Sequence, residues 1–291
     1  MRAHVRRLTV ALAAVTLATG ALVGPAGVAD ARERTGHGSG VTRCSALPWQ
    51  ARDVVVDGDL LVDGPCELTD SVVHGDVRVL EAEGSYLLLR DSTVDGTLRV
   101  AGSVQVYGSD LGAIRLRAAT AVVLAFGSTV AGDVTGPGQW LELADVHVLG
   151  DVRSSAFETD LERATVDGDV RITDGWTWIL DSTLGGSLQI TRPPFGVIVC
   201  GTDVAGGVTV RDAAAAVDVG PRATCPTGPD APTTTVGGTL TLLRNVGPVR
   251  VGDVRVAGDL VCRANVGGVA VLDGVTVDGT RRGQCAGRPT S

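Results

Sequence analysis

The segment ATVDGDVRI, residues 164–172, carries the pattern that decides the fold. Val166, Gly168 and Val170 fall on one face of an extended chain, and the polar residues between them fall on the other. This period of two is typical of a β-strand with one buried face, because an amphipathic helix would repeat its apolar residues at three and four positions. The segment therefore predicts a half-buried strand.

The same sequence motif recurs along the chain, for example as SVVHGDVRV at 71–79 and STLGGSLQI at 182–190. A degenerate copy, SDLGAIRL, lies at 109–116. The anchor glycines lie 16 to 21 residues apart, except for one interval of 32. One such strand cannot bury its apolar face alone, but stacked coils form a continuous core. We therefore predict a parallel β-helix, a solenoid of about twelve coils. The anchor glycines are Gly58, Gly75, Gly96, Gly112, Gly132, Gly150, Gly168, Gly186, Gly206, Gly238, Gly258 and Gly279.

An antiparallel sandwich is the alternative all-β fold. It would need hairpin turns between successive strands, and a constant motif at constant pitch is not expected there.

We expect the β-helix to be right-handed, since parallel crossover connections are overwhelmingly right-handed. We expect each anchor glycine at a corner, where a side chain would crowd the bend or block a positive φ.

The N-terminal segment reads as an export signal. Three arginines precede the apolar run 8–23, and Ala29-Asp30-Ala31 offers a cleavage site, so 1–31 is predicted to be a signal peptide. The alternative, a membrane anchor, would need about 20 apolar residues. We expect a secreted protein with a flexible leader at 32–43, a β-helix over 44–291 with a loop insertion at about 220–235, and no membrane span after signal removal.

Composition and charge narrow the partners. The net charge of −8 becomes −10 once the signal, with three Arg and one Asp, is removed. An acidic surface argues against nucleic acid as a partner, because phosphates are bound by basic surfaces. All 25 basic residues are arginines, so a lysine base is excluded from any catalytic site. The Val-rich and Gly-rich composition favours strands and tight turns.

The six cysteines predict disulfides between sequence neighbours. Each neighbouring pair is separated by one coil plus a few residues, which places its members on adjacent rungs within bridging distance. Metal binding is the competing interpretation, but no pair has the short spacing and nearby His of a zinc site. The predicted bridges are Cys44–Cys66, Cys200–Cys225 and Cys262–Cys285.

Two resemblances follow from these motifs. The repeated V-x-G-D-V at about 18-residue pitch resembles bactofilins, the bacterial polymer-forming β-helix proteins. The opening VVVDGDLLVDGPCELTDSVVHGDVRV and the closing NVGPVRVGDVRVAGDLVC…GQC are similar to uncharacterised secreted proteins of high-GC Gram-positive bacteria. The second resemblance implies export and a β-helix but no known activity. Unlike bactofilins, this chain carries an export signal and six cysteines.

Aspartates that follow successive anchor glycines are a candidate calcium site. Asp133, Asp151 and Asp169 are 18 residues apart and should stack as a column on consecutive coils. Carboxylates in such a column repel one another unless a cation neutralises them, and calcium prefers oxygen ligands. The alternative is that Arg153 and Arg171, two residues further on the same outward face, compensate the charge.

Aromatic residues on a second strand of each coil are the candidate binding residues. Tyr86, Trp140 and Trp176 occupy the same outward position, eight residues before the motif's first Val or Leu, and Trp178 lies two residues on. An exposed aromatic stripe commonly marks a ligand surface, and flat rings suit sugars. The alternatives are that a loop covers the stripe or that a bulge turns the rings inward.

These patterns favour a non-catalytic structural or binding protein of the cell envelope, with a cell-wall glycan or an envelope protein as its partner and no cofactor. Many secreted β-helices cleave polysaccharides, so a lyase or glycosidase is the second interpretation. A bactofilin-like self-assembling scaffold is the third. The sequence contains no recognisable Ser–His–Asp grouping or other catalytic motif.

Overall fold

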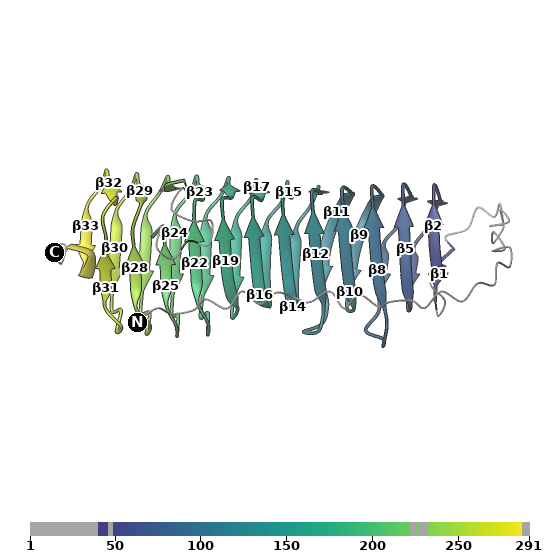
Figure 1. Ribbon diagram of the computed structural model, residues 1–291, viewed down its shortest axis with the longest axis horizontal. Coiled ribbons are helices and arrows are strands. Elements are labelled where there is room, and N and C mark those ends of the chain that lie inside the picture. The colour runs from purple at the N-terminus through teal and green to yellow at the C-terminus, as the bar shows by residue number, and fades with distance from the viewer. Residues whose placement is uncertain (1–39, 46–48, 222–224, 226–231, 287–291) are drawn as a thin grey trace, which may run out of the picture. The chain divides into compact units, whose positions relative to one another are not determined.

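The computed structural model describes residues 40–45, 49–221, 225 and 232–286. These residues form 33 β-strands and one short 3-10 turn, η1 (Gln284–Ala286). The strands pair in parallel with the next coil from end to end, so the predicted parallel β-helix of about twelve coils is confirmed (Figure 1). The expected signal peptide 1–31 and residues 32–39 of the expected leader lie outside the described residues.

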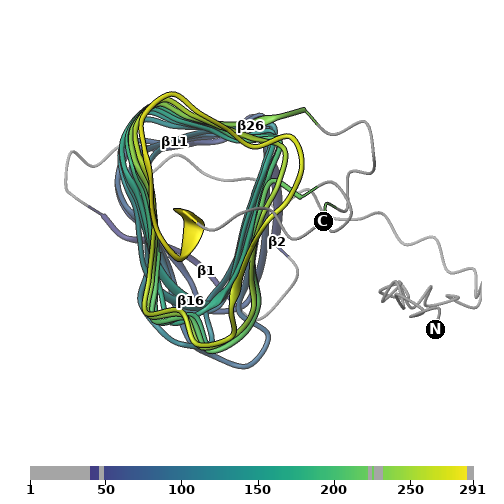
Figure 2. The same ribbon diagram turned by 90° about the vertical axis from the view of Figure 1, so that its left-hand side faces the viewer.

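Each coil has three sides, and the view along the axis shows a triangular outline (Figure 2). Sheet A, the first side, is made of the short strands that precede the anchor glycines. Its members are β3 (Val55–Val56), β6 (Val72–Val73), the starts of β9 (Thr93–Val100) and β11 (Asp110–Leu116), β13 (Thr129–Val130), β15 (His147–Val148), β17 (Thr165–Val166), β20 (Thr183–Leu184), β23 (Asp203–Val204), β26 (Thr234–Val236), β29 (Val254–Val256) and β32 (Thr276–Val277).

Sheet B, the second side, follows the anchor glycines. It begins with β1, two residues before the expected start of the β-helix at residue 44. Its members are β1 (Thr42–Cys44), β4 (Leu60–Val62), β7 (Val77–Val79), the ends of β9 and β11, the starts of β14 (Val134–Ala144) and β16 (Val152–Glu162), β18 (Val170–Thr173), β21 (Leu188–Thr191), β24 (Val208–Arg211), β27 (Leu240–Leu243), β30 (Leu260–Arg263) and β33 (Arg281–Gly283).

Sheet C, the third side, carries the predicted aromatic residues. The strands β14 and β16 run through the corner and contribute their C-terminal halves to it. Its members are β2 (Trp49–Arg52), β5 (Pro65–Thr69), β8 (Tyr86–Arg90), β10 (Ser103–Tyr107), β12 (Val122–Phe126), the ends of β14 and β16, β19 (Trp176–Leu180), β22 (Val197–Cys200), β25 (Val217–Val219), β28 (Val249–Val251) and β31 (Val269–Val271).

The core is a stack of aliphatic side chains inside the triangle. Ile114, Val134, Val152 and Val170 are in register on consecutive rungs and are fully buried. Apolar burial of this kind contributes about 25 cal/mol to the free energy of folding per Å² removed from water.

In the part of the chain that the structure describes, no helix is both long and apolar enough to span a bilayer.

The anchor glycines are required by close stacking. A Cβ atom added at Gly75 would lie 2.6 Å from the carbonyl oxygen of Gly58 on the previous coil, and one at Gly258 would lie 2.7 Å from that of Gly238. The expected positive φ is wrong for these glycines, because none of them has one. The left-handed residues instead include those between sheets C and A, where Asp is the commonest residue type; Asp tolerates this conformation better than most non-glycine residues.

Buried hydroxyls stabilise the corner between sheets C and A. The backbone N–H of Ser71 donates to Ser92 Oγ at 3.1 Å, that of Ser92 donates to Ser109 Oγ, and that of Ser109 donates to Ser128 Oγ. Each of these hydroxyls in turn donates to a carbonyl of its own coil. The ladder satisfies backbone groups that would otherwise be buried without partners.

The three predicted disulfide pairings are confirmed. The Cα–Cα distances are 6.0 Å for Cys44–Cys66, 5.9 Å for Cys200–Cys225 and 5.3 Å for Cys262–Cys285. The first and third join adjacent rungs at the two ends of the stack. The second holds Cys225, within the expected insertion at 220–235, against the outer side of sheet C. Most of that insertion lies outside the described residues.

Candidate binding surface

Seven side chains on the outer side of sheet C form one surface, called here the tryptophan–carboxylate patch. They come from three neighbouring strands, with Trp140 in register with Glu158 and Trp176, and Glu142 in register with Asp160 and Trp178. The residues between them along each strand, such as Leu141, Leu161 and Ile179, are buried in the core. Strand alternation therefore turns the patch outward. Its members are Trp140 and Glu142 on β14, Glu158, Asp160 and Glu162 on β16, and Trp176 and Trp178 on β19.

The centre of the patch is a recess of about 170 Å³ between the tryptophans. Trp140 and Trp178 flank it, and Glu142, Asp160 and Glu162 line it. The Trp140 indole N–H donates to Asp160 Oδ2 at 3.0 Å. Asp160 Oδ1 and the Trp178 indole nitrogen are buried with no hydrogen-bond partner among the described residues. Both atoms are closed off from solvent, so a ligand reaches them only if the side chains that cover them move.

Three carboxyls of the patch have pKa values above the ordinary values of these groups. Burial is the main cause that raises the pKa of Asp160 to about 7. The charges of Glu158, Glu142 and Glu162 act in the same direction, and the hydrogen bond from Trp140 acts against them. Burial also raises the pKa of Glu142, with Glu162 and Glu158 adding to the effect. The pKa of Glu158 is raised by burial as well. A cation placed here would favour the charged form of all three carboxyls.

Acidic residues elsewhere on the surface are commonly matched by an arginine on the next coil. Asp145 pairs with Arg163 at 2.7 Å, and the corresponding pairs are Asp174–Arg192, Asp212–Arg244 and Asp218–Arg250. By contrast, Glu142, Glu158 and Asp160 have no salt-bridge partner in the described part of the chain. Within the described chain, the patch therefore gathers three carboxyls without a salt-bridge partner on two neighbouring strands.

Exposed aromatic rings extend the patch around the corner to sheet B. The Trp176 ring stacks on Phe195 at 5.9 Å between centroids and on Trp178 at 6.1 Å, and Phe195 meets Phe157 edge-on at 5.0 Å. Trp176 and Phe195 are each 37% exposed and Phe157 is 45% exposed. Contiguous exposed rings of this kind mark a ligand surface more often than isolated ones do.

The two phenylalanines were missed in the sequence. Phe195 lies in the irregular segment between β21 and β22, and Phe157 lies at the bend within β16, so neither occupies the strand position used to find the tryptophans. The carboxylates Glu142 and Asp160 were missed because no motif marks the strand that carries them. The extra residues RPPFG in a coil with a 20-residue interval were the available signal for Phe195.

The predicted aromatic residues are not all brought together. Tyr86 lies on β8, and β10 and β12 separate it from Trp140. Its hydroxyl donates to Gln105 Oε1 at 3.1 Å, and burial raises the pKa of the phenol. Trp178 is partly covered, because it packs against Leu180 and the Cys200–Cys225 bridge. The tryptophans therefore form the candidate surface without Tyr86.

The candidate calcium column has internal partners. The backbone N–H of Asp151 donates to Asp133 Oδ1 at 2.9 Å, and that of Asp169 donates to Asp151 Oδ1 at 2.8 Å. Arg153 contacts both Asp133 and Asp151, and Arg171 contacts Asp169 at 2.7 Å. This is the arginine compensation that the sequence offered as the alternative. Within the described residues, no group of three or more His, Cys, Asp or Glu side chains is arranged to hold a metal.

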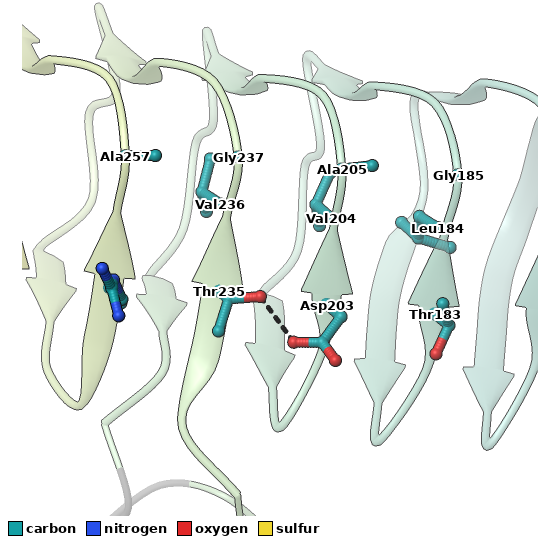
Figure 3. Close-up of a pocket in the computed structure, with 11 residues that line it drawn as sticks. Thr183, Leu184, Gly185, Asp203, Val204, Ala205, Thr235, Val236, Gly237 and Ala257 are labelled. Carbon is teal, nitrogen blue, oxygen red and sulfur yellow. Dashed lines mark hydrogen bonds between the residues drawn. The ribbon is translucent and has the colours of Figure 1, made fainter.

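A second, shallower hollow lies on the outer side of sheet A. It has a volume of about 280 Å³ and is lined by outward residues of β20, β23 and β26 and the small residues that follow them (Figure 3). The Thr235 hydroxyl donates to Asp203 across it. None of the residues that line it is aromatic, and its walls are small side chains such as Gly185 and Ala205. It therefore offers less for specific binding than the patch does.

Comparisons of the chain with protein-family models, curated proteins and solved structures found no significant match.

Proposed function

We propose that this protein is an exported, non-catalytic binding rod of the cell envelope, and that the tryptophan–carboxylate patch binds a glycan. The single observation that carries this proposal is the recess that Trp140 and Trp178 line together with three carboxyl side chains. Indole faces pack against the apolar faces of sugar rings, and carboxylates accept hydrogen bonds from sugar hydroxyls. The rungs of the sheet repeat every ~4.8 Å, which suits an extended chain of repeating units.

Two properties support the envelope location, and a third supports the binding role. The N-terminal segment has the pattern of a signal peptide. Three cysteine pairs lie at disulfide distance, and disulfides persist in oxidising compartments outside the cytosol. A stack of coils joined by continuous backbone hydrogen bonds also makes a rigid support, which lowers the entropy cost of holding the patch ready for a ligand.

Substitution of the tryptophans tests the proposal. We expect Trp140→Ala, Trp176→Ala and Trp178→Ala, alone or combined, to weaken binding to insoluble cell-wall glycans at least tenfold, since each ring contributes roughly 0.5–1.5 kcal/mol beyond its buried area. Co-sedimentation of the disulfide-bonded chain with isolated cell-wall polysaccharide measures the effect. Tyr107→Ala, on the same sheet side but on β10, is the matched control and should bind as the wild type does. Equal binding by the tryptophan variants would refute the proposal.

Polysaccharide hydrolysis is the second candidate, and the state of Asp160 favours it. A glycosidase needs a protonated carboxyl beside an ionised one, and Asp160, with a pKa of about 7, lies directly across from Glu142 on the neighbouring strand. Release of reducing sugar from the same glycans, lost in Asp160→Asn and in Glu142→Gln, would establish it. Binding without release supports the non-catalytic proposal.

A further inference from the structure

We propose that the ligand of the tryptophan–carboxylate patch is a glycan that carries free amino groups, such as a polymer of unacetylated amino sugars. This inference rests on the proposed function and names its ligand class. It follows from the charge, the aromatic walls and the unsatisfied atoms of the recess, which act on one ligand together.

Charge complementarity selects a cationic ligand. Glu142, Glu158 and Asp160 have no salt-bridge partner among the described residues. Arg163, which directly follows β16, already contacts Asp145 and Glu162. An acidic glycan would be repelled. A neutral glycan would exclude water from these carboxyls without supplying a positive charge, which carries a desolvation cost for those that are ionised.

The tryptophans favour the same ligand. Trp140 and Trp178 line the recess. Indole rings have electron-rich faces, and a cation over such a face is attracted by about 0.5–2 kcal/mol. A protonated amine attached to a sugar ring would therefore find carboxylates for its charge, and the sugar ring would find indole faces for its apolar side. The combination of aromatic walls and unpaired carboxylates is the arrangement that protein sites use for ammonium groups.

The unsatisfied atoms define how the amine is held. Asp160 Oδ2 is already occupied by the Trp140 indole N–H, whereas Oδ1 is buried without a partner. Oδ1 is covered by its neighbours, so an ammonium group reaches it only when those side chains move aside. The bond then formed would complete the hydrogen bonding of this carboxylate, and a charge-assisted bond of this type is about twice as strong as a neutral one.

The test compares two oligosaccharides that differ only at nitrogen. Oligomers of β-1,4-linked glucosamine and of N-acetylglucosamine, of equal length, are titrated into the disulfide-bonded chain by calorimetry at pH 6. We expect the glucosamine oligomer to bind at least tenfold more tightly and its affinity to fall as salt is raised. Asp160→Asn and Glu142→Gln, which keep side-chain size, should abolish the preference, while Glu67→Gln, a carboxyl on β5 outside the patch, should keep it.

The outcomes separate the two proposals. If the wild type binds both oligomers equally, or if the Asp160 and Glu142 variants keep the preference, the amine inference is overturned and glycan binding stands. If the wild type binds neither oligomer nor any insoluble cell-wall glycan, both proposals fall. Circular dichroism and melting of each variant confirm that the coils remain folded, so that lost preference reports the site.

Discussion

Asp160 shows how a single residue can link the fold to the candidate site. Its in-register neighbours are Glu142 and Trp178, and the Trp140 indole donates a hydrogen bond to it, so folding removes water and adds negative charge at once. Proteins keep such an arrangement where the unfavourable local environment serves binding or catalysis. Asp169, which lies just before a strand of sheet B, instead contacts an arginine two residues further along the chain.

Asp160 should make the fold less stable as the pH rises. Its pKa is about 7 in the folded protein against an ordinary value of 3.8, so its contribution to stability is fully present below about pH 4 and is lost as the pH rises through 7. Three pKa units correspond to about 4 kcal/mol, and solvent around this partly exposed carboxyl reduces the expected loss to about 2 kcal/mol. The groups that face Asp160 are Glu142 on β14, Glu158 and Glu162 on β16, and Trp178 on β19.

Urea denaturation of the wild type and Asp160→Asn between pH 5 and pH 8 measures this effect. We expect the wild type to lose stability relative to the variant across that range. Asp145→Asn is the control, because its hydrogen bond to Arg163 lowers the pKa of Asp145, and its effect should therefore appear only at more acidic pH. Parallel stability profiles for the wild type and Asp160→Asn would contradict the interpretation.

At the scale of the element, the anchor glycines and the left-handed corner residues have separate roles. We expect Gly75→Ala to destabilise the fold by about 2 kcal/mol, because its Cβ would meet the backbone of Gly58 at 2.6 Å and the stacked coils leave no room to shift. Gly127→Asp is the matched control. Gly127 has a φ of 54° and open space around it, and Asp145 occupies the equivalent corner on the next coil. Denaturation midpoints measure both, and equal losses would show that stacking is not what requires glycine.

The elements also show which parts of the molecule the sequence predicts. Asp133, Asp151 and Asp169 stack as expected because a constant 18-residue interval converts directly into contact between coils. The degenerate copy is one residue shorter before Gly112, and the structure accommodates it by a register shift between Leu111 and Ala113. Phe195 could not be placed, because an irregular segment has no periodicity to count. The charge of the patch could not be predicted either, since it depends on which glutamates lack an arginine on the next coil.

At the scale of the whole molecule, the disulfides protect the ends of a stack in which each coil contacts only its neighbours. Removing Cys262–Cys285 by a double substitution to Ser should cost about 3 kcal/mol of local stability, given its sequence separation of 23 residues. Hydrogen exchange should then accelerate in β30 and β33, because the bridge joins β30 to η1 directly after β33, and it should stay slow in β14, β16 and β19. Faster exchange spread evenly along all coils would contradict this nearest-neighbour behaviour.

The position of the patch along the axis has a consequence for a protein exposed to proteases. In the described chain, five strands of sheet C precede β14 and four follow β19, so the tryptophans sit near the middle of the stack. Trimming by exopeptidases, or unravelling from either terminus, must pass through several complete coils before it reaches them. A partly degraded molecule would therefore keep an intact ligand surface, because the outer coils would be degraded first.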